Sequence, residues 1–141
     1  MLSMKAKYAL KALIYMAQHH SEAVRSRQIA ESENIPQKFL DNILQELRTN
    51  GLVDAKRGIF GGYFLKKPAS DIRLGDIIRI IDGPLAPIRC ASLTAYQKCD
   101  DCADEATCQL RRLMFDVRNA MSAILDGRCL QDLVDNPGLA A

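Results

Sequence analysis

Four cysteines lie in one short stretch of the chain and are the residues best suited to chemistry. They follow the pattern Cys-x8-Cys-x2-Cys-x5-Cys, at Cys90, Cys99, Cys102 and Cys108. Thiolates bind soft metals such as zinc and iron, and they also exchange with disulfides. Zinc sites usually contain two CxxC pairs or histidine, whereas this stretch has one CxxC and no nearby histidine. The spacing therefore indicates a thiolate-bound metal of unspecified type, and a thiol switch or inert loop cysteines stay open as alternatives.

Length and composition predict one cytoplasmic domain in which these thiols stay reduced. The chain has 141 residues and is 48% hydrophobic, enough for a single modest core. No apolar run reaches the roughly 18–20 residues that span a bilayer. The N-terminal residues 1–13 place lysines within an amphipathic pattern and do not resemble a signal peptide. Clustered cysteines in the cytoplasm favour metal or redox chemistry over structural disulfides.

The elements before the cysteines predict a winged helix-turn-helix head over residues 1–82. Apolar residues at helical spacing predict four helices, at 3–20, 27–33, 36–49 and 74–81. Two short strands joined by a glycine-containing loop predict a hairpin, at 52–55 and 62–65. Helix, helix, turn, helix and a two-stranded ribbon is the element order of a winged helix. The expected fold is mainly α with a small β-hairpin wing.

The third predicted helix and the wing carry side chains suited to DNA. Opposite its leucines, the helix presents a row of polar residues: Gln37, Lys38, Asp41, Asn42, Gln45 and Arg48. Gln and Asn pair with adenine, Lys and Arg with guanine or phosphate, and Asp accepts from cytosine. In the hairpin, Lys56 and Arg57 suit a narrow, electronegative minor groove. We therefore expect these eight residues to contact double-stranded DNA.

The distribution of charge supports a polyanionic partner for the first half of the chain. Residues 1–67 carry eleven Lys/Arg and six Asp/Glu, a net charge of +5, whereas residues 68–141 carry eight and eleven, a net charge of −3. A winged-helix module that binds another protein instead of DNA is the alternative. The sequence has no Ser-His-Asp set, phosphate loop or paired-carboxylate motif, so we do not expect an enzyme.

The second half predicts a sensor loop followed by a dimerisation helix. Residues 83–103 have no clear period, and a long helix is expected from 104 to about 125. Its apolar residues are spaced 4-3-4-3, which is a heptad seam: Leu110, Met114, Val117, Met121 and Ile124. Because two heptads are too short to hold a dimer alone, we expect residues 130–134 to join the same interface. Residues 104–141 are thus predicted to form the homodimer, with a pseudo-palindromic operator as its partner.

Several segments resemble the Rrf-two (Rrf2) family of bacterial winged-helix regulators. They are YAL at 8–10, LRTNGLV at 47–53 and RGIFGGY at 57–63, followed by Cys90 and its loop. The resemblance covers nearly the whole chain. It implies a homodimeric regulator that senses redox, iron or nitric oxide status through an iron–sulfur cluster, either 2Fe-2S or 4Fe-4S.

The same resemblance implies which residues would hold the cluster. Three loop cysteines are ligands in cluster-binding members, and Cys90, Cys102 and Cys108 match that pattern. IscR-like members add a histidine where this chain has Arg111, and NsrR-like members add an aspartate where it has Lys7. Cys99 is an additional thiol and a candidate fourth ligand. Some members have no cluster, so a thiol switch or zinc in the same loop remains the alternative.

Overall fold

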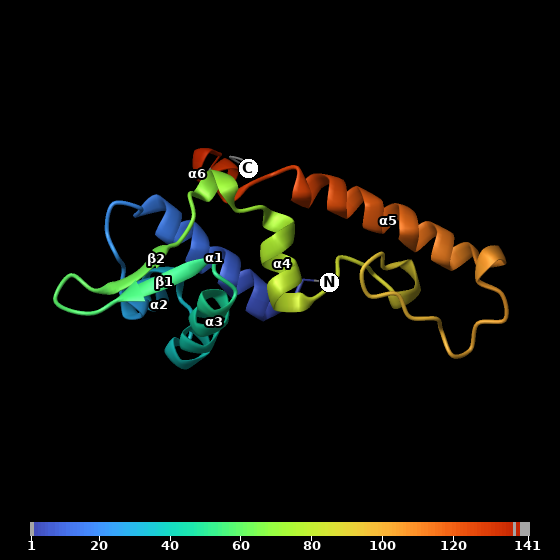
Figure 1. Cartoon of the computed structure of the whole chain (residues 1–141), viewed down its shortest axis with the longest axis horizontal. Coiled ribbons are helices and arrows are strands. Elements are labelled where there is room, and N and C mark those ends of the chain that lie inside the picture. The colour runs from blue at the N-terminus through green and yellow to red at the C-terminus, as the bar shows by residue number, and fades with distance from the viewer. Residues whose placement is uncertain (1, 137, 139–141) are drawn as a thin grey trace.

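A helical head and a long helical arm make up the molecule, which the computed structural model describes at residues 2–136 and 138 (Figure 1). The order of helices and strands is α1 Met4–Gln18, α2 Ser26–Glu33, α3 Gln37–Thr49, β1 Val53–Lys56, β2 Gly62–Leu65, α4 Leu74–Asp82, α5 Gln109–Asp126 and α6 Leu130–Asp135. This order confirms the predicted fold class, mainly helical with a two-stranded wing. In the described part of the chain, no helix has the length and apolar character needed to cross a membrane.

The core of the head forms where α1, α3 and α4 bury one face each. Helix α3 is a clear case, because its apolar residues recur at i, i+3, i+4 and i+7 and all are fully buried: Leu40, Ile43, Leu44 and Leu47. Helix α1 contributes Leu13 and Met16 to the same cluster. The N-terminus of α1 is capped by Ser3, whose Oγ accepts from the Ala6 amide at 3.0 Å. Burial of one α3 face fixes the opposite face toward solvent.

The wing is an antiparallel hairpin extended by one residue from the chain before α2. Ala55 pairs with Tyr63 within the hairpin. Tyr63 also exchanges two backbone hydrogen bonds with Val24, at 2.7 and 2.8 Å. A Cβ on Gly62 would lie 2.5 Å from the Val24 carbonyl oxygen, so only glycine permits this approach. The wing is therefore held by pairing between its own two strands and by hydrogen bonds to the segment that precedes α2.

Helix α6 packs against the head through Leu130, and the expected contribution of residues 130–134 to a dimer interface stays a prediction. Leu130 is fully buried in the head core, and its amide donates to the Ile72 carbonyl at 2.8 Å. The Leu74 amide donates to the Arg128 carbonyl at 3.1 Å, which completes a short bridge. Two backbone hydrogen bonds and a core leucine hold this segment where it lies. The chain thus leaves the head, runs along the arm, and returns to the head.

The arm is α5 together with the loop that precedes it (Figure 1). Helix α5 begins at Gln109 rather than at residue 104, because Glu105–Thr107 form a separate 3-10 turn. Asp104 caps that turn by accepting from the Ala106 amide at 3.0 Å. None of the eighteen residues of α5 is buried, whereas α1, α2, α3, α4 and α6 each contain at least one buried residue. The apolar side of α5 is therefore only partly covered within the described chain, since Met114 and Met121 are half-buried and Leu110, Val117 and Ile124 are exposed.

Candidate DNA-binding face and cysteine loop

Helix α3 presents all six predicted DNA-contacting side chains to solvent. Gln37, Lys38, Asp41, Asn42, Gln45 and Arg48 are each exposed, opposite the fully buried leucine face. Lys38, Asn42 and Gln45 make no side-chain hydrogen bond with any residue that the structure describes. These three side chains are therefore free to reach base edges or phosphates without breaking an existing contact.

The other three polar residues on α3 are already hydrogen-bonded. Gln37 donates to Asp41 Oδ1 at 2.9 Å and to the Ser26 hydroxyl at 2.8 Å, which links α3 to the start of α2. Arg48 Nε donates to Asp54 Oδ1 at 3.2 Å. A hydrogen bond from the Ala55 amide lowers the pKa of Asp54, and the Arg48 charge lowers it further. Arg48 is thus held toward the wing by a carboxylate that a DNA phosphate would have to replace.

The wing places two cations beside a tight turn. Lys56 and Arg57 are both exposed. The turn follows them, and it closes through a hydrogen bond from the Gly61 amide to the Gly58 carbonyl at 3.0 Å. Arg25 Nη2 donates to the Gly58 and Ile59 carbonyls, each at 3.1 Å. Arg25 is a residue that sequence reasoning missed, because its partners lie more than thirty positions away.

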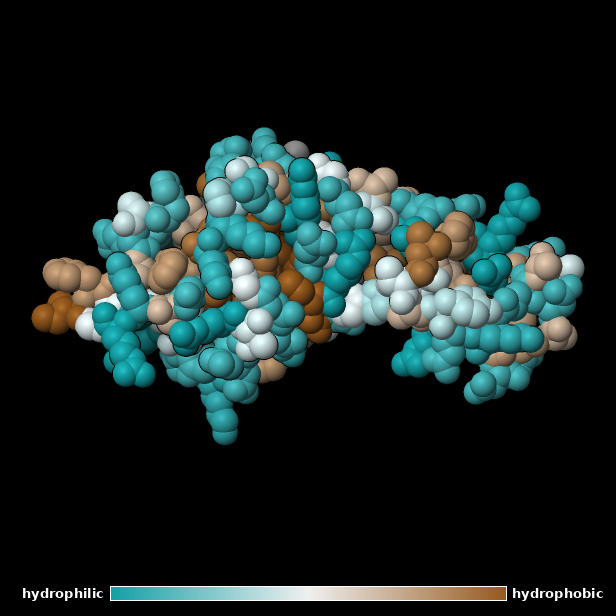
Figure 2. Space-filling view, in the orientation of Figure 1, coloured by the Kyte–Doolittle hydropathy of each residue, from teal (hydrophilic) through white to brown (hydrophobic). Residues whose placement is uncertain are grey.

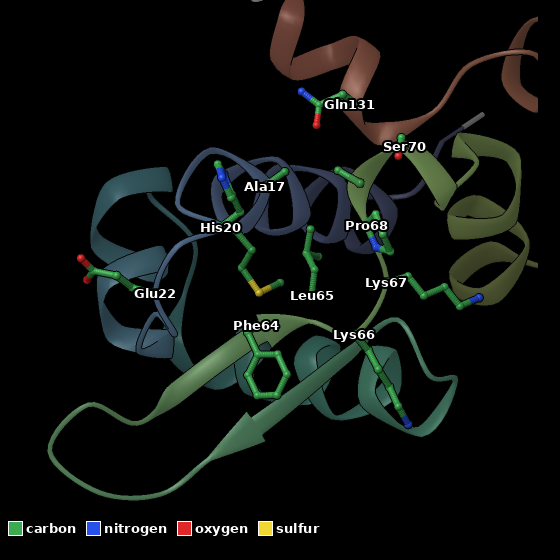
Figure 3. Close-up of a pocket in the computed structure, with 12 residues that line it drawn as sticks. Ala17, His20, Glu22, Phe64, Leu65, Lys66, Lys67, Pro68, Ser70 and Gln131 are labelled. Atoms are coloured by element: carbon green, nitrogen blue, oxygen red, sulfur yellow. The ribbon is translucent and has the colours of Figure 1, made fainter.

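A cavity of about 490 Å³ lies between α1, β2 and α6, on the side of the hairpin that faces α1 (Figure 3). Small and apolar residues such as Ala17 and Leu65 contribute to its walls. Figure 3 shows that Glu22, Lys66 and Lys67 point away from its interior. Catalytic pockets usually contain several convergent polar groups. The polar residues His20, Ser70 and Gln131 also line the cavity, but no hydrogen bond joins their side chains to one another in the described structure.

Within the cysteine loop, the structure brings Cys90 and Cys99 together. The Cys99 thiol donates to Cys90 Sγ, with the sulfur atoms 3.9 Å apart. This hydrogen bond raises the pKa of Cys99. Cys90 is buried and Cys99 is exposed, while Cys102 and Cys108 are half-buried. Among the described residues, no group of three or more Cys, His, Asp or Glu side chains is gathered closely enough to hold a metal ion. Of the four predicted cysteine ligands, the structure places the thiols of Cys90 and Cys99 in contact and leaves the other two thiols apart from them.

Cys108 and Arg111 connect the cysteine loop to α5. Cys108 caps the helix, since its Sγ accepts from the Arg111 amide at 3.4 Å. The Arg111 side chain turns back, and its Nε donates to the Cys90 carbonyl at 3.0 Å. Arg111 is therefore a cation that ties the Cys90 turn to α5. Sequence reasoning identified Arg111 as a departure but not its contact.

The end of α5 is joined to the head by a two-pronged ion pair. Arg79 of α4 donates from Nη1 and Nη2 to the two carboxylate oxygens of Asp126, both at 2.7 Å. Ser122 donates to the same carboxylate at 2.7 Å. The Arg79 guanidinium lowers the pKa of Asp126 to about 2. A Cβ on Gly75 would lie 2.0 Å from Asp126 Oδ1, which shows how closely α4 and α5 approach. This contact also was not foreseen from the sequence.

An exposed polar helix, a cationic wing and a helix-turn-helix core define a winged-helix protein of the DNA-reading class. The family described as "Rrf2: Iron-dependent Transcriptional regulator" matches residues 2–136. An rrf2-like protein of Rhodobacter capsulatus is 40% identical over an alignment of 138 residues, which covers 95% of this chain and 92% of that protein. The chain therefore belongs to the Rrf2 family, as its motifs indicated. It is a transcriptional regulator and not an enzyme.

Solved structures agree with this assignment. CymR, the global cysteine regulator of Bacillus subtilis, has a TM-score of 0.79 and 31% identity, with 96% of each chain covered. IscR from T. potens has a TM-score of 0.76 and 27% identity, with 98% of this chain and 88% of that chain covered. Membership of this family implies DNA binding, which sets aside the alternative of a module that binds only protein.

Proposed function

We propose that the chain is a homodimeric, cytoplasmic regulator that reads a pseudo-palindromic operator in double-stranded DNA with α3 and the wing. The single observation that carries this proposal is the two-sided character of α3, with one face fully buried and six polar side chains exposed on the other. In a winged helix this exposed face enters the major groove, while the wing reaches the flanking minor groove. Base-edge contacts come from Lys38, Asn42 and Gln45, and Arg57 with Lys56 enters the minor groove.

The apolar side of α5 supports the proposed homodimer. Leu110 is 57% exposed, Val117 37% and Ile124 54%, although all lie on one heptad seam. A helix with no buried face gains little stability from packing, so such a helix requires a partner. A second copy of the chain supplies the same α5 seam, with its helix running antiparallel to the first, as a two-fold axis across the helices requires. The proposed division is a head over residues 1–82, on which α6 also packs, a sensor loop over 83–103, and a dimerisation segment over 104–141 whose main element is α5.

We further propose that the loop cysteines hold an iron–sulfur cluster. Their donor chemistry fits, since four thiols occur within nineteen positions and iron–sulfur clusters are held by thiolates. Two thiolates on one tetrahedral metal at about 2.3 Å lie about 3.8 Å apart, close to the 3.9 Å between Cys90 and Cys99. A 2Fe-2S cluster takes two protein ligands on each iron, so this spacing favours that type. Cys99 is then the fourth ligand beside Cys90, Cys102 and Cys108.

The same pair of thiols also favours a second candidate, a thiol switch. A disulfide between Cys90 and Cys99 needs their sulfur atoms to approach from 3.9 Å to about 2.05 Å, a small movement for an exposed loop. Zinc is a third possible occupant of the cysteines. Two observations separate these candidates: visible colour with iron and labile sulfide marks the cluster, whereas a colourless protein with zinc or no metal marks the others.

The sensor loop lies where a change can reach the DNA-binding head. Cys90 follows α4 closely in the chain, Cys108 caps α5, and Arg111 connects the two segments. An iron–sulfur cluster supplies a redox-active centre when it is bound. Cysteines that bind a cluster would add a second connection between α4 and α5, beside the Arg79–Asp126 ion pair, and their release would leave the angle between these helices less restricted. Because each half of the dimer carries one α3, this angle sets the half-site spacing that the dimer can match.

Anaerobic purification of the full chain, followed by iron and sulfide analysis, tests the sensor. We expect iron and sulfide in the wild type and their loss in each of four variants: Cys90→Ala, Cys99→Ala, Cys102→Ala and Cys108→Ala. The matched control is Cys129→Ala, because Cys129 lies outside the loop and its thiol is turned to Asp132 at 3.4 Å. Retention of full iron by Cys99→Ala would remove Cys99 as the fourth ligand. A wild-type protein purified without iron would contradict the cluster and would favour the thiol switch or zinc.

A further inference from the structure

We propose that Ile59 and Phe60, at the tip of the wing, enter the minor groove as an apolar wedge that partly unstacks one base step. This inference rests on the DNA-binding function proposed above and adds a mode of contact to it. Two large apolar side chains are 86% exposed at this tip, the highest exposure among the large hydrophobic residues of the described chain. Figure 2 shows the apolar surface at this end of the molecule.

The geometry of the turn directs both side chains outward. The hydrogen bond from Gly61 to Gly58 makes Ile59 and Phe60 the two central residues of a four-residue turn. The backbone is so tight here that a Cβ on Gly61 would lie 2.5 Å from the Lys56 carbonyl oxygen. Central turn positions ordinarily carry Gly, Asn, Asp or Pro, and exposed tips are ordinarily polar. An Ile-Phe pair gains nothing for folding at this place, which points to a contact outside the chain.

The tip is also held in place before any partner arrives. Arg25 Nη2 donates to the carbonyls of Gly58 and Ile59, so the backbone at the apex is fixed to the start of α2. Tyr63 and Val24 fix the base of the wing through two further hydrogen bonds. A preorganised loop loses less conformational freedom when it binds. Both features suit an element that must insert into a narrow space.

The charges around the apolar tip identify the partner as duplex DNA. Lys56 and Arg57 lie directly before the turn, and Arg25 lies beside it, so three cations surround two apolar side chains. The minor groove has the complementary arrangement, with phosphates at its two rims and stacked bases between them. Proteins that bend DNA often insert Phe or Ile between base steps from that groove. Pyrimidine–purine steps unstack most easily, so one is expected under the wing.

The test uses a duplex selected from a random pool by the wild-type protein. Ile59→Ser/Phe60→Ser removes the wedge, Ile59→Leu/Phe60→Leu keeps an apolar one, and Arg57→Ala removes a charge. Affinity is measured by fluorescence anisotropy at several salt concentrations. Bending is measured by energy transfer between the duplex ends, and unstacking by the emission of 2-aminopurine in the flank. Thermal unfolding of each variant, with its exposed substitutions, is expected to match the wild type.

The serine variant is expected to lose affinity by about 10-fold or more with an unchanged salt dependence, because no charge is removed. It is also expected to bend the duplex less and to leave 2-aminopurine quenched. The leucine variant stays within about 3-fold of wild type, and Arg57→Ala lowers the salt slope by about 1. A serine variant that binds and bends the duplex like wild type overturns the wedge. A wild type that selects no duplex overturns the DNA-binding function itself.

Discussion

Asp126→Asn removes the charge from the contact that joins the arm to the head and leaves its shape nearly unchanged. The Arg79 guanidinium lowers the pKa of Asp126 from 3.8 to about 2. In free energy of unfolding this difference corresponds to at most about 2.4 kcal/mol. Because the Asp126 side chain is 38% exposed, solvent screening reduces that figure. We expect Asp126→Asn to lower the free energy of unfolding by about 1 kcal/mol at neutral pH.

The contribution of Asp126 to the free energy of unfolding depends on pH in a direction that its lowered pKa determines. The folded-state pKa of Asp126 lies below its unfolded value, so the ionised carboxylate favours the folded state above about pH 4. The contribution is lost as pH falls from about 4 to about 2. Asparagine does not titrate in this range. The difference in stability between wild type and Asp126→Asn should therefore be constant near neutrality and should disappear in acid.

Urea unfolding followed by far-ultraviolet circular dichroism, at about pH 7, 5 and 3 and at equal protein concentration, measures this difference. Asp76→Asn is the matched control, because Asp76 also contacts Arg79, at 3.3 Å, but its side chain is 62% exposed. We expect the control to lose only a few tenths of a kcal/mol. Equal losses in the two variants, or a difference that does not shrink in acid, would refute this reasoning.

Three further predictions concern assembly, DNA and the head. Val117→Glu places a charge in the α5 seam and should give a monomer in sedimentation, while Asn119→Glu on the exposed side should stay dimeric; a dimeric Val117→Glu would place the interface elsewhere. Lys38→Ala should weaken operator binding by about 1–3 kcal/mol if it reaches a base edge, and Arg57→Ala should weaken A·T-flanked sites most; equal losses on random DNA would make both phosphate contacts. Leu130→Ala should destabilise the head by about 2–5 kcal/mol in urea, and a loss below about 1 kcal/mol would contradict its place in the core.

The local elements of this protein could be predicted from its sequence. The α3 leucines repeat at helical spacing, so the same pattern that buries one face exposes Gln45 and Arg48 on the other. Glycines at 58, 61 and 62 indicated a tight wing, and the structure shows short approaches to backbone at Gly61 and Gly62. Periodicity and turn chemistry act over a few residues, which is why the helices, the wing and the family motifs could be read directly.

The long-range contacts were decided only by the tertiary structure. Ile72 bonds to Leu130 across 58 positions, and Arg79 pairs with Asp126 across 47, but no local pattern selects these partners. The apolar residues at 130–134 predicted a covered surface, but they did not show that the head core would cover Leu130. The sequence likewise grouped four cysteines by spacing, whereas within the described loop the thiol-to-thiol hydrogen bond joins Cys90 and Cys99 alone. Burial and charge pairing depend on what the rest of the chain brings alongside, and that is fixed by packing in three dimensions.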